Sequence, residues 1–266
     1  MVIDDYLIHY KKPSQYIYWG ENGVDVFNRD ESEKAFRKTQ HYPNVSLLDI
    51  TPEQFKTIAR DMLAFDTGIF FNSGQFIFNI FEFEKIPVRE KTRREIVEWR
   101  LKKVFPENLD DYDHQFFPVG KKRILSVLFK KSLKEKVETF FEDNKLSLIY
   151  MGNSTLEIFN HASAFGRTAP DFFVEIDRAL SIIVFLDKGV PIYVRKFRSD
   201  QTAPGIVNEI VKTVNFMKNN YQQDPHTFFL VGEPTEIDFN FIQEELTKLE
   251  IRPLELKNRA QLFFTR

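Results

Sequence analysis

The clearest pattern near the start of the chain is a pair of short runs rich in β-branched and aromatic residues. These runs, at residues 16–20 and 24–27, flank an Asn-Gly pair, which is a strong signal for a β-hairpin. A helix is predicted to begin after Thr51, because Thr51 and Gln54 have the spacing of a capping box and apolar residues follow at helical intervals. We therefore expect a hairpin followed by a capped helix.

Extended runs and amphipathic helices alternate through the rest of the first half. An apolar run at residues 68–72 and an alternating run at 75–83 are predicted to form a second hairpin, with Ser73-Gly74 as its turn. A charged helix is predicted at residues 90–104. Further strands are predicted at residues 123–129 and 147–151, and further helices begin at Ser132 and Ser154 as predicted N-caps.

The second half repeats this mixture of strands and helices. Strands are predicted at residues 172–176, 180–186, 191–197, 227–231 and 251–256, and helices at 204–219 and after Asp238. Gly166, Thr168 and Pro170 cluster between the halves and favour a boundary there. We therefore predict two α/β lobes: residues 1–165, which include an inserted hairpin and helix subdomain, and residues 166–266.

The composition is that of a folded protein with balanced charge. Of the 266 residues, 42% are apolar and 29% are charged, so the chain can bury a substantial core. Lys and Arg number 37 against 39 Asp and Glu, which gives a formal net charge of −2. Because this balance argues against broad electrostatic binding to nucleic acid, we expect no nucleic-acid partner.

The absence of cysteine removes several classes of site. Disulfides, zinc–thiolate centres, iron–sulfur clusters and cysteine nucleophiles are all excluded. Residues 1–10 contain Asp4 and Asp5 and lack the basic and apolar regions of a secretory signal peptide. No stretch reaches the roughly 18 uncharged apolar residues that a membrane span needs. We expect a cytoplasmic protein without a membrane span.

Common catalytic motifs are absent from the sequence. It contains no P-loop, Gly-x-Gly-x-x-Gly, His-Glu-x-x-His or Gly-x-Ser-x-Gly motif. The five histidines are scattered singly, whereas a metal site brings two or more ligands together. An acidic cluster at residues 110–113 and basic clusters at 121–123 and 130–131 are interpreted as solvated surface. A hard-cation site and a phosphate or lipid contact are the respective alternatives.

Phenylalanine is unusually abundant, with 29 residues against 9 Tyr and 2 Trp. Filling of an apolar core explains such an excess, and an aromatic binding groove is the alternative. The alternating run at residues 75–83 is the segment where both readings apply, since it would either pack in the core or form the floor of a groove.

The order of the predicted elements in the middle of the first lobe resembles that of a known family. The alternating strand ends at Pro87, a charged helix closes before Pro106, an acidic stretch runs to Asp113, and a strand and a helix follow to about Asn144. This passage resembles the PilM and GspL families, the actin-like assembly proteins of bacterial type IV pili and type II secretion. The resemblance covers about residues 55–254 and implies an actin-like, ribonuclease-H-like fold of two lobes with mixed sheets.

The resemblance also identifies loops that would hold ATP in an active member of the fold. The first loop of the family reads Asp-x-Gly near the amino terminus, and residues 6–11 contain no such pair. Residues 172–177 resemble the second phosphate loop, with Glu175 as its acid and Asp177 at its glycine position. Phosphates need bare backbone amides close by, and a carboxylate at a glycine position would repel them.

The third loop shows the same departure. Gly232 remains at the position of the adenosine loop, but Glu233 follows where the family has a further glycine. The resemblance therefore implies vestigial loops at Glu175, Asp177, Gly232 and Glu233 rather than a cofactor site. We expect no catalytic residues, no metal, and neither ATP nor Mg²⁺ as a cofactor.

The function implied by the resemblance is that of a non-catalytic scaffold. In the family, such a protein lies at the inner face of the inner membrane and grips a short cytoplasmic tail of a membrane protein in a pilus or secretion platform. An extended peptide of this kind would add main-chain hydrogen bonds and place side chains in apolar pockets. Actin-like relatives also self-associate, so a homo-oligomer is compatible with this reading.

Two enzymatic readings stay open beside the scaffold. The first is an active actin-like ATPase or sugar-kinase-like enzyme, in which Glu175 would hold Mg²⁺ through water and Gly232 would border the adenine. The second is a ribonuclease-H-like nuclease, in which Glu175 and Asp177 would belong to a group of carboxylates around two metal ions. The first strand lacks a partner carboxylate for that group, because Asp4 and Asp5 precede it.

Overall fold

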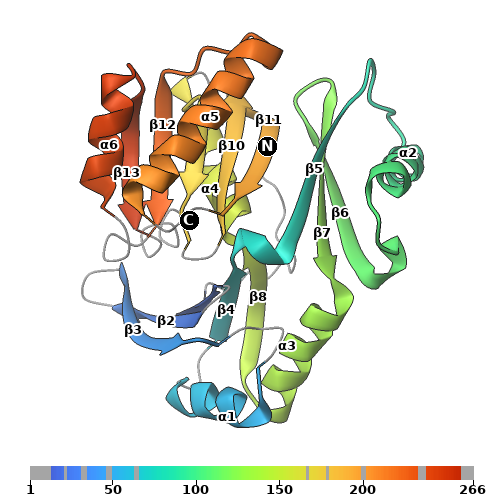
Figure 1. Ribbon diagram of the computed structural model, residues 1–266. Helices are drawn as coiled ribbons and strands as arrows, with labels where there is room; N and C mark the ends of the chain where they lie inside the picture. Colours follow the sequence, from blue (N-terminus) through green and yellow to red (C-terminus); the bar gives the residue numbers. More distant parts are fainter. Residues whose placement is uncertain are drawn as a thin grey trace.

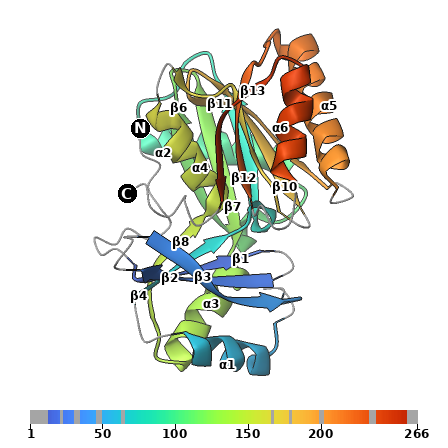
Figure 2. The ribbon, with the colours of Figure 1, turned by 90° about the vertical axis from the view of Figure 1, so that its left-hand side faces the viewer.

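The computed structural model describes residues 13–20, 23–30, 35–45, 50–62, 66–165, 168–177, 180–198, 202–232 and 238–258. Within them the strands form two five-stranded mixed sheets and one three-stranded antiparallel sheet. Figure 1 shows the first five-stranded sheet below, the second above it, and the three-stranded sheet beside the second. Figure 2 shows the same arrangement from the side.

The first five-stranded sheet has the order β3-β2-β1-β4-β8. Its first three strands form an antiparallel meander, and β4 and β8 run parallel to β1. Helices α1 and α3 cover one face, where Phe55 of α1 lies between Trp19 and Phe140. The bounds are β1 Gln15–Trp19, β2 Gly23–Asp30, β3 Ala35–Pro43, α1 Pro52–Asp61, β4 Asp66–Phe71, α3 Lys131–Asp143 and β8 Ser147–Asn153.

The second sheet has the order β11-β10-β9-β12-β13 and so repeats the plan of the first. Again three antiparallel strands are followed by two parallel ones, and α5 and α6 cover one face. The bounds are β9 Phe172–Glu175, β10 Ser181–Asp187, β11 Val190–Phe197, α5 Ala203–Tyr221, β12 Thr227–Gly232, α6 Phe239–Lys248 and β13 Arg252–Asn258.

Helix α4, Ser154–Ala164, leads from the first sheet to the second. The two sheets therefore correspond to the two α/β lobes with mixed sheets that the sequence predicts. The predicted boundary after residue 165 stays a proposal, and it falls between the last strand of one sheet and the first strand of the other.

An insertion between β4 and α3, which we call the arm, comprises residues 76–130. Its sheet has the order β5-β7-β6, and α2 packs on one face through Val97 and Leu101. The other face meets the second lobe, where the Lys196 ammonium of β11 donates to the Phe76 carbonyl. The bounds are β5 Phe76–Glu82, α2 Glu90–Val104, β6 Tyr112–Val119 and β7 Arg123–Lys130.

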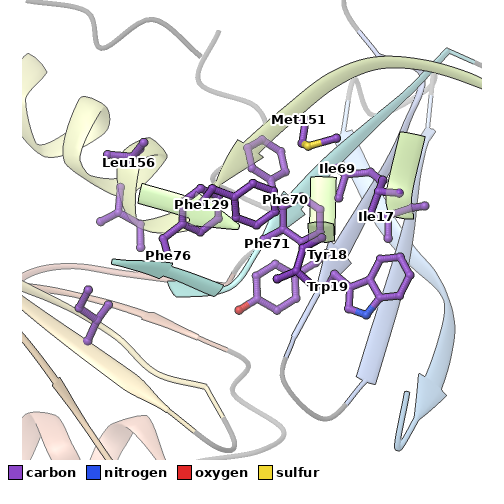
Figure 3. Close-up of a cluster of buried hydrophobic side chains, with 14 of the residues drawn as sticks. Ile17, Tyr18, Trp19, Ile69, Phe70, Phe71, Phe76, Phe129, Met151 and Leu156 are labelled. Atoms are coloured by element: carbon purple, nitrogen blue, oxygen red, sulfur yellow. The ribbon is translucent and has the colours of Figure 1, made fainter. Parts of the chain in front are cut away.

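One hydrophobic core runs through the first lobe, the arm and the inner face of the second lobe. Phe129 of β7 lies 5.2 Å from Phe71 of β4 and 4.6 Å from Phe76 of β5, measured between ring centroids. Figure 3 shows these three rings side by side. The same buried cluster continues to Leu156 of α4 and Phe173 of β9. Core filling therefore accounts for the Phe-rich run at residues 75–83, whose Phe76 and Phe83 are buried.

The predicted hairpin of residues 68–83 is wrong. Strand β4 pairs with β1 and β8, whereas β5 pairs with β7 in another sheet. The cause is a one-turn 3₁₀ helix, Ser73–Gln75, and the Asn72 side chain that accepts a hydrogen bond from Gly74 N at 2.8 Å. The chain therefore leaves the first sheet at Asn72 instead of folding back on it.

The predicted helix caps are partly right. Thr51 and Gln54 form the expected capping box at α1, and Asp238 caps α6. Ser132 is not a cap, because α3 begins one residue earlier and its N-cap, Lys130, makes no side-chain cap bond. Ser154 is already helical, and the Asn153 side chain accepts from Leu156 N instead.

Candidate functional site

The carboxyl ends of the parallel strands in the two lobes face each other. In Figure 1, β4 ends toward the second lobe and β12 ends toward the first. Ligand sites of α/β sheets lie at such carboxyl ends. We call the residues gathered there the interlobe site. It is built from the β1–β2 turn, the start of α4, and the ends of β9 and β12.

Glu175, the last residue of β9, is a buried carboxylate bound to the start of α4. It is only 2% exposed. Thr155 Oγ1 donates to its Oε2 at 2.6 Å, and the Ser154 hydroxyl donates to its Oε1. A carboxylate at a helix N-terminus is further stabilised by the helix dipole. Glu175 thus links the second lobe to the helix that leaves the first.

Asp177, two residues further on, contacts the first lobe directly. The Tyr18 hydroxyl of β1 donates to Asp177 Oδ2 at 2.6 Å, across a separation of 159 residues. Tyr18 is 2% exposed and Asp177 is partly buried, so the donor side of this bond is shielded from solvent. The carboxylate also lies against the β1–β2 turn, since a Cβ atom on Gly20 would be 3.4 Å from Asp177 Oδ2.

Gly232, the last residue of β12, is fixed by close packing. A Cβ atom there would lie 3.1 Å from Phe239 of α6 and 3.2 Å from the Ile176 carbonyl. A larger residue would therefore push β12 away from the segment that carries Glu175 and Asp177. The structure brings Glu175, Asp177 and Gly232 together. Glu175 and Asp177 are the chain neighbours of Ile176, and Gly232 packs against the Ile176 carbonyl.

Some predicted residues lie outside the described residues. Glu233 and residues 6–11, the segment compared with the first phosphate loop, both belong to this group. Within the described chain, the turn that follows the first strand of the first sheet is the one between β1 and β2, bounded by Gly20 and Gly23. Gly20, at the start of this turn, lies against Asp177.

Sequence reasoning did not single out Tyr18, Gly20, Ser154 or Thr155 as site residues. The Asn-Gly hairpin signal was present, and the place of that hairpin as the first in an actin-like sheet would have pointed to Tyr18 and Gly20. Ser154 was noticed only as a predicted cap. No local signal connects it to Glu175, which lies 21 residues further along.

The basic residues where the arm joins α3 bond to acidic residues or to the backbone of the arm. Lys130 Nζ lies 3.3 Å from Glu107, Lys131 Nζ donates to the Asp110 carbonyl at 2.7 Å, and Lys134 lies 3.1 Å from Asp113. Among the described residues, no three His, Asp or Glu side chains are grouped so that they could hold a metal ion. None of the helices in the described ranges is long and apolar enough to cross a membrane.

No protein-family model matches the sequence, and no curated protein matches it significantly. Solved structures do resemble it. A Bacteroides thetaiotaomicron VPI-5482 protein with an actin-like ATPase fold and unknown function matches with a TM-score of 0.62 and 11% identity over 96% of each chain. The PilM–PilN type IV pilus biogenesis complex matches with a TM-score of 0.66 and 13% identity, over 94% of this chain and 89% of that one.

A further match is the cytoplasmic domain of EpsL, an inner-membrane component of the type II secretion system of Vibrio cholerae. Its TM-score is 0.60 at 7% identity, over 94% of this chain and 92% of that chain. The three structures together establish the fold, and the predicted actin-like architecture of two lobes with mixed sheets is confirmed.

Proposed function

Given an actin-like fold shared with PilM and the EpsL cytoplasmic domain, we propose that this protein is a non-catalytic scaffold of a type IV pilus or type II secretion platform. It would lie at the inner face of the inner membrane and bind the short cytoplasmic tail of a membrane partner. The main support for a non-catalytic role comes from the interlobe site. There the carboxylates of Glu175 and Asp177 both accept hydrogen bonds from residues of the protein itself.

ATP with Mg²⁺ does not fit this arrangement. Asp177 lies beside Gly20 in the turn where a bare backbone would face phosphate. Two unit negative charges 4 Å apart repel by about 4 kcal/mol at an effective dielectric constant of about 20. Glu175 already accepts hydrogen bonds from Ser154 and Thr155, so each of its oxygens has a partner within the protein.

The continuous core also favours a scaffold over an enzyme that closes around its substrate. Lid and domain closure needs parts that move against one another. Here Leu156 of α4, Phe129 of the arm and Phe173 of the second lobe belong to one buried cluster. Close-packed interiors resist deformation, so this core limits large closing movements of the lobes and favours a stable binding surface.

An active ATPase is the alternative that one observation favours. Gly20 and Gly232 both stand at close approaches in the interlobe site, as glycines do where backbone meets a nucleotide. Titration calorimetry with Mg-ATP separates the two functions. We expect heats equal to those of diluting Mg-ATP into buffer, and saturable binding would contradict the non-catalytic proposal.

The partner is tested separately by affinity capture. The tagged protein is incubated with detergent-solubilised membranes of its own source, and bound proteins are identified by mass spectrometry. We expect enrichment of a pilus or secretion subunit relative to beads that carry an unrelated protein. A synthetic peptide of that subunit's cytoplasmic tail should then compete. Failure to recover any such subunit would overturn the scaffold assignment.

A further inference from the structure

We propose that Asp177 is an internal ligand of the first lobe, and that its bond to Tyr18 holds the two lobes closed without a nucleotide. The proposal goes beyond the scaffold function and does not depend on which partner the protein binds. It assigns Asp177 a positive structural role, in contrast to the merely vestigial role that the sequence suggests.

The bond has the properties of a strong contact between lobes. Its donor belongs to β1 of the first lobe and its acceptor to the turn after β9 of the second, and the two oxygens are 2.6 Å apart. This is the length of a charge-assisted O–H···O⁻ hydrogen bond. Tyr18 is 2% exposed and Asp177 is partly buried, so water has limited access to the bond.

Both partners are held rigidly by their own lobes. Tyr18 lies in a strand paired on both sides, opposite Asp25 of β2 and Phe70 of β4. Asp177 directly follows Ile176, whose N–H donates to the Val231 carbonyl of β12 at 2.8 Å within the second lobe. The segment from Glu175 to Asp177 therefore contacts the first lobe twice, at α4 through Glu175 and at β1 through Asp177.

Gly20, which precedes the β1–β2 turn, leaves room for this carboxylate because it has no side chain. A Cβ atom on Gly20 would lie 3.4 Å from Asp177 Oδ2 and 3.3 Å from the Gly23 carbonyl. Alanine would therefore just fit, whereas a β-branched side chain would displace Asp177. In this reading the carboxylate occupies the space between the facing turns that an external anion would otherwise take.

The test measures the separation of the lobes by pulsed electron paramagnetic resonance. The chain has no cysteine, so Gln40→Cys on β3 and Asn219→Cys on α5, both exposed, provide one spin label in each lobe. Without nucleotide, the parent protein should give a narrow distance distribution. Tyr18→Phe and Asp177→Ala should each shift it to longer distances and broaden it, because one anchor of the closed arrangement is gone.

The matched control is Tyr112→Phe, which removes a tyrosine-to-carboxylate bond, to Glu107, that lies wholly within the arm. It should leave the distance distribution unchanged. Gly20→Val should also move the lobes apart. It keeps Tyr18 and Asp177, but its side chain displaces Asp177. Circular dichroism checks that each variant is folded.

An unchanged distribution in folded Tyr18→Phe and folded Gly20→Val would overturn the internal-ligand proposal and show that the apolar core alone sets the lobe arrangement. That outcome would leave the scaffold function standing, because partner capture is measured independently. The converse result is a parent protein that captures no pilus or secretion subunit, while Tyr18→Phe and Asp177→Ala still lengthen the distance between the labels. That result would contradict the scaffold function and leave the internal-ligand proposal standing.

Discussion

Ser154 contributes through its hydroxyl alone, since its side chain is 1% exposed and directed at a buried carboxylate. Hydrogen bonds to charged groups contribute about 1.5–3 kcal/mol. We therefore expect Ser154→Ala to lower the free energy of unfolding by about that amount, as measured by urea denaturation. Thr57→Ala is the control, because its hydroxyl bonds the Glu53 carbonyl on an exposed helix face. Equal losses in the two variants would contradict the assigned role.

His114 makes stability depend on pH. Burial, and then the positive charge of Arg94, lower the pKa of His114 from the usual 6.5 to about 4. Between those values the unfolded state binds a proton that the folded state does not, so stability falls as the pH drops from 6.5 to 4. Above pH 6.5 the residue is neutral in both states and contributes nothing.

The slope that His114 adds is at most about 1.4 kcal/mol per pH unit, and less because the ring is only partly buried. His114→Gln should flatten the fall in unfolding free energy between pH 6.5 and 4. Denaturation curves at four or five pH values measure this. A profile for His114→Gln identical to that of the parent protein would refute the effect.

At the scale of elements, Thr51 and Ser132 are both predicted N-caps, but only Thr51 caps a helix in the structure. Thr51 accepts a hydrogen bond from Gln54 N at 3.2 Å, whereas Ser132 lies inside α3. Thr51→Ala should cost about 0.5–2 kcal/mol of unfolding free energy. Ser132→Ala, at an exposed helical position, should change it by less than about 0.5 kcal/mol. Thermal unfolding of the two variants side by side gives the comparison, and a larger loss for Ser132→Ala would contradict the structure.

Elements with a strong local signal could be predicted from the sequence. The first hairpin follows from its Asn-Gly turn, and helix α1 from its capping box. Strand β3 was missed, because its exposed residues 37–40 show no apolar alternation. Strand β6 was missed because it begins in an acidic stretch and contains Pro118, which the structure tolerates since β6 is an edge strand.

Strand pairing and the site contacts could not be predicted in the same way. Nothing local distinguishes a β4–β5 hairpin from two strands in separate sheets, because the choice depends on β1, β7 and β8. Glu175 and Asp177 were singled out by resemblance to the phosphate loop of a family. Their partners Tyr18 and Ser154 come from other elements, and only the folded chain brings them together.

At the scale of the whole molecule, the shared core predicts that the lobes and the arm unfold together. Phe129 is fully buried between the first lobe and the arm. Trp19 reports on the first lobe when Trp99 is replaced by Phe, and circular dichroism reports on the whole chain. The two signals should give coincident denaturation curves. Two separate transitions would show that the lobes are energetically independent.

Truncation of Phe129 tests the same core through the size of the loss in unfolding free energy. Phe129→Ala should lower the free energy of unfolding by about 3–5 kcal/mol, because it removes a ring from a close-packed interior. Phe216→Ala, at a ring that is 40% exposed on α5, removes the same atoms and should cost clearly less. Urea denaturation measures both, and comparable losses would argue against a core shared by the arm and the first lobe.

The two five-stranded sheets have the same strand order. The contact between the β1–β2 and β9–β10 hairpins therefore resembles the interface of a twofold dimer, but within one polypeptide. In a true twofold interface each contact occurs twice. Here Val174 stands in β9 where Tyr18 stands in β1, one residue before the strand end, and valine has no hydroxyl to donate. At this position β9 therefore has no counterpart of the Tyr18 donor. Within one chain, strand β1 of one half can supply the donor and the segment after β9 of the other half the acceptor, whereas identical subunits would have to carry both.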